Sequence, residues 1–281
     1  KKYDIFQWVK VFMDRLQFVK EKQADLESKA LDKKIVAQMK AEFRKAKNPL
    51  LFLDYDGTLV GFKGRPEEAY PDEELKEVVA KLAEKSKTVI ISGRDKETLG
   101  TWFKDQKVDM IAEHGVWLKK IDQKEDWILY AEVDDSWKED IRKVMEYYVL
   151  RTPGALIEEK HHSLVWHYRK VESGLGDLRM RELFSHLKYM ARGHNLQVLE
   201  GNKVLEIKRP DINKGRAATA IMKGGDYDFI MALGDDWTDE DTFKAMPKNA
   251  YTIRVGYTYT QANYNIKNPK AVRDLLKSLI E

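Results

Sequence analysis

The sequence contains no cysteine, which excludes disulfide bonds and thiol catalysis and leaves the redox compartment open. It also lacks an apolar run of about 18 residues and a signal-peptide pattern, so we expect no membrane-spanning helix and no membrane partner. A marked excess of either charge is missing too, because 50 Lys and Arg stand against 47 Asp and Glu. The net charge of +3 argues against a general nucleic-acid-binding protein, and a cytoplasmic location fits these observations.

Several ligand-binding motifs are absent as well. No Gly-x-x-x-x-Gly-Lys occurs, which disfavours a P-loop kinase or ATPase. Gly174 and Gly176 have no third glycine after them and no apolar strand before them, so they do not form a dinucleotide-binding fingerprint. A calcium-binding loop that opened at Asp54 would need Gly and Glu where Leu59 and Arg65 stand. These three classes are therefore set aside.

The length of 281 residues suits one large domain or two ordinary ones. With 43% hydrophobic and 35% charged residues, the chain can form a real core under a solvated surface. The first residue is Lys rather than Met, which favours a fragment of a longer protein. Residues 1–47 carry apolar residues at steps of three and four, which predicts an N-terminal helical segment. We expect this segment to pack on the core or to connect it to an upstream domain.

Residues 50–53 form a short all-apolar run that is typical of a buried central strand in a parallel sheet. The run leads directly into Asp54, Asp56 and Gly57. Ligands of open α/β sheets bind outside the carboxyl ends of the strands. Two carboxylates at that place indicate a metal site, or a nucleophile with an acid–base partner. The structural alternative is a strand followed by an ordinary Asp-Gly turn.

A second apolar strand is predicted at residues 88–91, and it ends at Ser92, Gly93 and Arg94. A hydroxyl, a glycine and the start of a helix can together hold a phosphate through the hydroxyl and backbone N–H groups. The structural alternative for Ser92 is a simple helix cap, which is common.

A third apolar strand, at residues 228–233, ends in a loop that carries Asp235, Asp236 and Asp239, and Lys214 opens the preceding helix. If these groups meet Asp54 at one sheet edge, carboxylates suited to Mg²⁺ lie beside positive charge suited to a phosphoryl group. The sequence therefore predicts phosphoryl chemistry at this edge.

Residues 122–207 differ in pattern from the rest, since they predict a strand, a helix, two strands, a helix and two more strands. This order suggests an antiparallel α+β unit rather than more parallel sheet. Residues 48–121 and 208–281 would then form one Rossmann-like α/β core that the unit interrupts. We expect a hinge near residues 121–127 and 206–210, with open and closed forms.

Four motifs in chain order resemble those of the haloacid dehalogenase superfamily of phosphotransferases. They are Asp54-Tyr55-Asp56-Gly57-Thr58, Ser92-Gly93-Arg94, Lys214-Gly215 and Gly234-Asp235-Asp236 with Asp239. The α+β unit falls between the second and third motifs, where the larger type of cap of this superfamily sits. The resemblance implies a haloacid dehalogenase core with an inserted α+β cap domain.

Further motifs are similar to those of the trehalose-6-phosphate phosphatase family. They are Glu113-His114-Gly115, Glu158-x-Lys160, His167-Tyr168-Arg169, Lys208-Arg209-Pro210 and Gly234-Asp235-Asp236-x-Thr238-Asp239-Glu240. The resemblance covers about residues 48–281 and leaves the N-terminal segment outside. A synthase-like domain often precedes the phosphatase in fungal and plant relatives, which implies an upstream synthase-like domain or a trehalose synthase complex as partner.

The resemblance also implies catalytic roles. Asp54 would attack phosphorus and become an aspartyl-phosphate. Asp56 would protonate the leaving sugar oxygen and then take a proton from water. Ser92 and Lys214 would hold the phosphoryl oxygens, since positioning and charge stabilisation dominate phosphoryl transfer.

The cofactor that the resemblance implies is Mg²⁺. It would lie between Asp54, the backbone carbonyl of Asp56 and Asp235. Asp236 or Asp239 would be a further ligand or would support the ligands, and the sequence leaves both choices open.

The cap is expected to contact the sugar through charged residues on its strands. The candidates are Glu158, Lys160, Arg169 and Glu206, with Arg94 and Asn202 as weaker ones. Such side chains hydrogen-bond sugar hydroxyls well, although the same residues could form the solvated face of an ordinary sheet.

The resulting hypothesis is a magnesium-dependent phosphatase that hydrolyses trehalose 6-phosphate to trehalose and phosphate. Two alternatives remain. One is a phosphatase for another sugar phosphate, such as sucrose phosphate, and the other is a catalytically silent regulatory subunit of a trehalose synthesis complex.

Overall fold

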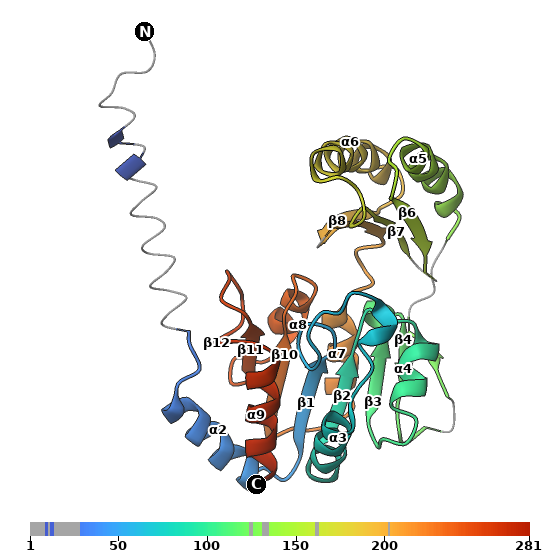
Figure 1. The fold of residues 1–281 in the computed structure, drawn as a ribbon. Coiled ribbons are helices and arrows are strands. Elements are labelled where there is room, and N and C mark those ends of the chain that lie inside the picture. The colour runs from blue at the N-terminus through green and yellow to red at the C-terminus, as the bar shows by residue number, and fades with distance from the viewer. Residues whose placement is uncertain are drawn as a thin grey trace.

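The computed structural model describes residues 9–10, 12–13, 29–123, 126–130, 135–160, 163–201 and 203–281. The described chain forms a large sheet between two layers of helices, with a smaller unit of four strands and two helices above it (Figure 1). The predicted fold class, an α/β parallel-sheet core with an inserted α+β unit, is confirmed. Within the described ranges, no helix is both long enough and apolar enough to cross a membrane.

The large sheet has eight strands, and its middle strand is the first apolar run of the sequence. In spatial order the strands are β12 (Tyr264–Ile266), β11 (Tyr251–Val255), β10 (Phe229–Gly234), β1 (Pro49–Asp54), β2 (Lys87–Ile91), β3 (Asp109–Ala112), β4 (Trp117–Lys119) and β5 (Ile128–Leu129). The first six are mutually parallel, and β4 and β5 are antiparallel additions. All six residues of β1 are buried, because helices cover both faces of the sheet.

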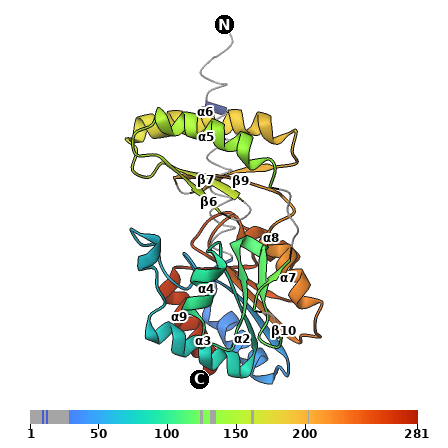
Figure 2. The same cartoon turned by 90° about the vertical axis from the view of Figure 1, so that its right-hand side faces the viewer.

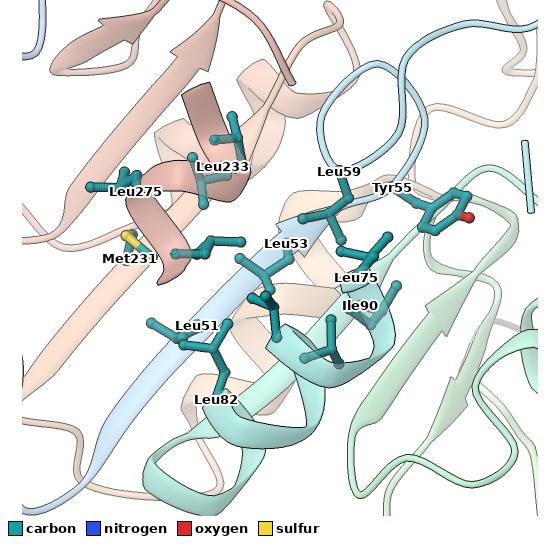
Figure 3. Close-up of a cluster of buried hydrophobic side chains, with 14 of the residues drawn as sticks. Leu51, Leu53, Tyr55, Leu59, Leu75, Leu82, Ile90, Met231, Leu233 and Leu275 are labelled. Atoms are coloured by element: carbon teal, nitrogen blue, oxygen red, sulfur yellow. The ribbon is translucent and has the colours of Figure 1, made fainter. Parts of the chain in front are cut away.

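The side chains of β1 alternate between two apolar clusters. Leu51 and Leu53 pack under α3 (Glu73–Lys85) and α9 (Pro269–Ile280), as Figure 3 shows for part of this cluster. Leu50 lies in the cluster on the opposite face. This two-sided burial fixes the register of the strand, and with it the position of the residues that follow it.

Further helices complete the two layers. The face of α3 and α9 also receives α2 (Lys33–Lys45) and α4 (Lys96–Trp102), whereas α7 (Lys214–Met222) and α8 (Asp239–Ala245) cover the other face. Short side chains cap several helix starts; for example, Asn213 accepts a hydrogen bond from the N–H of Arg216. A cap of this kind stabilises a helix by about 1 kcal/mol. Here it also fixes Lys214 as the first residue of α7.

The inserted unit has one antiparallel sheet and two helices. The strand order is β6 (Leu156–Glu159), β7 (Ser163–His167), β9 (Val204–Lys208) and β8 (Gln197–Gly201), and the helices are α5 (Lys138–Leu150) and α6 (Ser173–Ala191). Leu164 and Trp166 point into the apolar cluster under the helices. Val165 and Glu206, which are paired across β7 and β9, therefore lie on the opposite face. Figure 2 shows that this open face of the sheet is turned toward the core, with the helices outside.

Three elements differ from the sequence prediction. Residues 109–118, which the sequence predicts as a strand with a glycine turn, form two strands, because the turn Glu113–Gly115 reverses the chain between β3 and β4. Gly115 has φ +114 there, and a Cβ would lie 2.7 Å from the carbonyl oxygen of Asn213. The cap was predicted from residue 122, but β5 pairs with β4 in the large sheet and Trp127 packs on the core cluster. The third element is α6, for which the sequence predicts a helix over residues 178–192. It begins earlier, at Ser173, because the Glu172 carboxylate caps its first N–H groups.

The N-terminal segment is described mainly from residue 29 onward. Met39 and Phe43 of α2 are buried in the core cluster, which confirms the prediction of a helix packed on the core for this part. Before α2, Leu31 donates from its N–H to Asn265, and Asn265 donates to Lys29, so this segment pairs with the edge strand β12. The first apolar stripe, at residues 5–19, falls almost entirely outside the described residues.

Candidate active site

The carboxyl end of β1 places Asp54 against a lysine from a different element. Asp54 is only 4% exposed, and its Oδ1 lies 2.6 Å from Nζ of Lys214 at the start of α7. The same Nζ lies 2.7 Å from Oδ1 of Asp239, the first residue of α8. One buried ammonium group therefore bridges two buried carboxylates, at the point where β1, α7 and α8 meet.

The loop after β10 is shaped by Asp239. Its Oδ2 accepts hydrogen bonds from the N–H groups of Asp235 and Asp236, both at 3.0 Å. Gly234 is required beside it, because a Cβ at that position would overlap the Asp239 carboxyl group. Asp239 thus uses both oxygens, one for Lys214 and one for the loop.

Asp235 and Asp236 have different surroundings. The carboxylate of Asp235 is so close to Gly57 that a Cβ on that glycine, which has φ +81, would overlap it. The carboxylate of Asp236 instead accepts from the N–H of Trp237 at 2.7 Å, and its backbone oxygen accepts from Arg254 at 2.7 Å. Asp235 therefore joins the cluster around Asp54, and the side chain of Asp236 does not.

Burial and mutual repulsion of the carboxylates shift the pKa values in this cluster. Burial, followed by the charge of Asp239, raises the pKa of Asp54 well above its usual value despite the opposing effect of Lys214. The same two causes raise the pKa of Asp235 to about 7. Burial alone would lower the pKa of Lys214, but Asp239 and Asp54 raise it overall. Three carboxylates share one lysine, so the site is short of positive charge.

The donor set fits a divalent cation that prefers oxygen ligands. Carboxylate oxygens of Asp54, Asp235 and Asp239 all lie within 4.8 Å of one another. Oδ2 of Asp54 is buried and has no hydrogen-bond partner among the described residues, so it is free to bind a cation or to react. Mg²⁺ is usually held by one or two carboxylates together with substrate phosphate, which matches this arrangement.

The end of β2 supplies a second part of the site. Ser92 is fully buried, and its Oγ accepts from the N–H of Arg94 at 3.1 Å. The turn after β3 supports this loop, since Glu113 donates to the carbonyl of Arg94 and His114 donates to the carbonyl of Ser92. The His114 ring packs so closely on Gly93 that no Cβ would fit there. The sequence did not single out His114 as a site residue, although it follows a strand that neighbours β2.

Asp56 is not one of the three clustered carboxylates, and its side chain pairs with Arg94. Nε and Nη2 of Arg94 lie 2.9 and 2.6 Å from the two oxygens of Asp56. The guanidinium in turn lies 4.4 Å from the ring centre of Trp102. Arg94 was predicted as a sugar contact, and in this structure it is engaged with the predicted acid–base residue instead.

The open face of the cap sheet carries the predicted sugar contacts. Glu158 and Glu206 flank Val165 on neighbouring strands. His167 Nε2 lies 2.7 Å from Glu158, and the hydrogen bond between them lowers the pKa of this carboxyl group. Glu206 is 9% exposed, and its Oε1 has no partner among the described residues.

Two further cap candidates, Lys160 and Arg169, lie at opposite ends of this face. Lys160 reaches the core, where its Nζ lies 3.4 Å from the carbonyl oxygen of Gly93. It lines a narrow crevice between cap and core, together with His114 and Lys208. Arg169 is exposed just beyond the far end of β7. Asn202 lies outside the described residues.

A family model described as trehalose-phosphatase matches residues 52–274. The chain belongs to the trehalose-phosphatase family.

Two curated relatives are longer than this chain. The bifunctional trehalose-6-phosphate synthase/phosphatase of Thermoproteus tenax is 33% identical over 280 residues, which are 98% of this chain and 38% of that protein. A trehalose-phosphatase of Schizosaccharomyces pombe is 35% identical over 255 residues, which are 84% of this chain and 31% of that protein. Among solved structures, the C-terminal domain of Candida albicans trehalose-6-phosphate phosphatase matches with a TM-score of 0.82 at 28% identity, covering 90% of this chain and 98% of that one.

The sequence-predicted residues of this chain fall into two groups. The structure brings Asp54, Lys214, Asp235 and Asp239 together at one sheet edge. It places Glu158 and Glu206 on the separate sheet of the cap. Arg94 stands between the two groups, since it bonds Asp56 in the core and its charge contributes to the lowered pKa of Glu158 in the cap.

Proposed function

We propose that this chain is a magnesium-dependent phosphatase that hydrolyses trehalose 6-phosphate to trehalose and phosphate in the cytoplasm. The observation that carries the proposal is the buried Oδ2 of Asp54, which has no partner among the described residues and lies beside Lys214 and Asp235. A free carboxylate oxygen next to a buried ammonium group suits nucleophilic attack on a phosphoryl group. Membership of the trehalose-phosphatase family supports the choice of sugar phosphate.

The reaction has two steps that share one acid–base residue. In the first, Oδ2 of Asp54 forms a bond to phosphorus, the bond from phosphorus to the sugar oxygen breaks, and Asp56 gives its proton to that oxygen. In the second, Asp56 takes a proton from water as the water oxygen bonds to phosphorus. The bond between Asp54 and phosphorus then breaks, and inorganic phosphate leaves with Asp54 restored as a carboxylate.

Lys214 and Ser92 hold the phosphoryl group during both steps. The ammonium of Lys214 balances the charge of the phosphoryl oxygens, and the buried hydroxyl of Ser92 offers a hydrogen bond beside them. Asp54, Asp235 and the backbone carbonyl of Asp56 would hold Mg²⁺, which supplies positive charge where the phosphoryl group carries negative charge. Asp239 supports this set by orienting Lys214 and the Asp235 loop.

The open face of the cap sheet is the proposed sugar-binding surface. Glu158 on β6 and Glu206 on β9 lie on this face with β7 between them, and Lys160 lies at the edge nearest the catalytic loop. Sugar hydroxyls hydrogen-bond well to such charged groups. Arg169 is a proposed contact at the outer end of the face, and Asn202 is a further proposed contact. The synthase/phosphatase relative supports an upstream synthase-like domain, or a synthase complex, as partner.

The test is phosphate release from trehalose 6-phosphate, measured with Mg²⁺ and with a chelator, for the intact chain and for Asp54→Asn. We expect Mg²⁺-dependent release that falls by about 10³-fold or more in the variant. Release that survives Asp54→Asn would place the nucleophile elsewhere. No release from a folded intact chain would favour a silent regulatory subunit, and equal turnover of sucrose 6-phosphate would reject the assigned sugar.

A further inference from the structure

The ion pair between Arg94 and Asp56 prevents Asp56, the proposed acid–base residue, from transferring a proton. Both oxygens of Asp56 accept hydrogen bonds from Arg94, at 2.9 and 2.6 Å. The carboxylate side chain is 33% exposed, so it is not held in place by burial. A carboxyl group that accepts through both oxygens presents no proton to a leaving group. The hold must be released before the sugar oxygen can be protonated.

Aromatic rings keep Arg94 in this position. The guanidinium carbon lies 4.4 Å from the ring centre of Trp102 and 5.9 Å from that of Tyr55. These distances are typical of cation–π contacts. Tyr55 is itself fixed, because it is fully buried and its hydroxyl donates to the carbonyl of Ala69 at 2.6 Å. The arginine therefore rests on a rigid aromatic platform.

The same guanidinium faces the cap. Its charge is among the causes that lower the pKa of Glu158, after the hydrogen bond from His167, so the two groups lie within electrostatic reach of each other. Lys160 contacts the carbonyl oxygen of Gly93, the residue directly before Arg94, at 3.4 Å. A sugar held between cap and core would therefore lie within reach of Arg94.

We propose that Arg94 is a specificity-determining residue. It keeps Asp56 hydrogen-bonded and inactive until the hydroxyl groups of a bound sugar accept the hydrogen bonds of Arg94 instead. Arg94 has five N–H donors in a fixed fork, and hydroxyl oxygens of a bound sugar can accept from them. When they do, Asp56 is released, takes up a proton from water and gives it to the sugar oxygen bonded to phosphorus. A phosphate ester without hydroxyls leaves the pair intact and is cleaved slowly. Trp102 is a positioning residue in this scheme, because it acts only through Arg94.

The inference rests on the proposed phosphatase reaction and predicts a change in selectivity. In Arg94→Met we expect kcat/KM for n-propyl phosphate, a poor leaving group without hydroxyls, to rise about fivefold, as expected for releasing a bidentate pair of this exposure. For trehalose 6-phosphate we expect kcat/KM to fall by about tenfold or more, because a charged contact to the sugar is lost. For p-nitrophenyl phosphate, whose leaving oxygen needs no proton, we expect a change below about twofold.

The comparison uses kcat/KM because this quantity covers only the steps up to departure of the first product. Arg94→Lys keeps the charge but cannot hold both oxygens of Asp56, so it should give part of the rise with n-propyl phosphate. Trp102→Leu should raise the ratio of kcat/KM for n-propyl phosphate to kcat/KM for p-nitrophenyl phosphate by about twofold. Trp102→Phe keeps an aromatic ring, so its ratio should equal that of the unchanged chain. A merely destabilised protein would lower both activities equally.

Arg179→Met is the matched control, since Arg179 pairs with Glu182 at 2.7 Å on the cap helix α6. Arg179→Met should leave the ratio of kcat/KM for n-propyl phosphate to kcat/KM for p-nitrophenyl phosphate unchanged. If Arg94→Met lowers n-propyl phosphate and trehalose 6-phosphate turnover by the same factor, Arg94 orients Asp56 for catalysis and does not restrain it. Failure of the proposed function would appear separately, as absent trehalose 6-phosphate turnover by the intact chain.

Discussion

The catalytic edge of the large sheet and the open face of the cap sheet differ in how far their polar groups are already paired. At the catalytic edge, Lys214 lies between Asp54 and Asp239 at hydrogen-bond distance from both. On the cap face, Glu206 has a buried oxygen without a partner among the described residues, and Glu158 holds only His167 within that part of the chain. The groups assigned to chemistry are therefore held in position before substrate arrives, with only the reacting oxygen of Asp54 left free among the described groups of this edge that Lys214 holds, whereas the groups assigned to recognition are less fully paired.

The difference follows from the two kinds of sheet. Parallel strands buried on both faces bring the residues at their carboxyl ends to one edge, where helices α7 and α8 also begin. The antiparallel cap sheet has helices on one face only, so its other face can carry polar residues that wait for a ligand. The core therefore fixes the positions of the groups assigned to chemistry, and the cap carries polar groups that can adjust to a ligand.

The largest predicted effect comes from removing the lysine of the catalytic edge. Lys214→Met leaves buried carboxylates without their shared cation, so we expect kcat to fall by about 10³-fold and the unfolding free energy to fall by about 3 kcal/mol or more. Lys160→Met, in the cap, should mainly raise KM, by about tenfold. Steady-state kinetics and thermal unfolding of both variants would test the contrast. Similar kcat losses for the two lysines would break the distinction between edge and face.

A second prediction uses two glycines with positive φ. In Gly57→Ala the new methyl group would overlap the Asp235 carboxylate, so we expect about 10²-fold lower activity and weaker Mg²⁺ binding in addition to backbone strain. Gly256 has φ +88, and no described atom lies within 4 Å of the place that a methyl carbon would take, so Gly256→Ala should cost about 1 kcal/mol of stability and little activity. Calorimetric Mg²⁺ titration and kinetics would separate the two. Equal activity losses would show that strain alone explains Gly57.

The smallest effect is expected on the cap face. Glu206→Gln keeps the shape of the side chain but removes its charge, so we expect KM for trehalose 6-phosphate to rise about tenfold and p-nitrophenyl phosphate turnover to stay within about twofold. Glu200→Gln is the matched control, because Glu200 pairs with Leu205 and so shares the helix-facing side of the same sheet. A loss with both substrates would move Glu206 into the catalytic step.

Much of the fold and of the catalytic edge could be predicted from the sequence, because apolar runs mark buried parallel strands and the following residues must share an edge. Asp54 and Asp235 follow two such runs, and the structure places them together. The antiparallel strand β5 was assigned to the cap instead, since a two-residue edge strand carries almost no periodic signal.

Side-chain partners were harder to predict than strand positions. That Arg94 would bond Asp56 could not be read from spacing, because the two are 38 residues apart and several carboxylates lie nearby. The double use of Asp239 was hidden for a similar reason, since only the folded loop turns two N–H groups toward one oxygen. The local sequence pattern predicts the position of a residue on its strand or loop, whereas long-range packing determines which groups its side chain contacts.

The pairing of β1 with β10 has a consequence for the order in which the molecule can be assembled. Asp54 and Lys214 are 160 residues apart, and Thr58 and Asp235 are 177 apart, so the first half of the site is synthesised long before the second. Between them lies the cap, which has its own apolar cluster and can form while β1 still lacks one neighbour. A chain interrupted after the cap would expose one side of its central strand, a state prone to association. Completion of the sheet and creation of the active site are therefore the same late event.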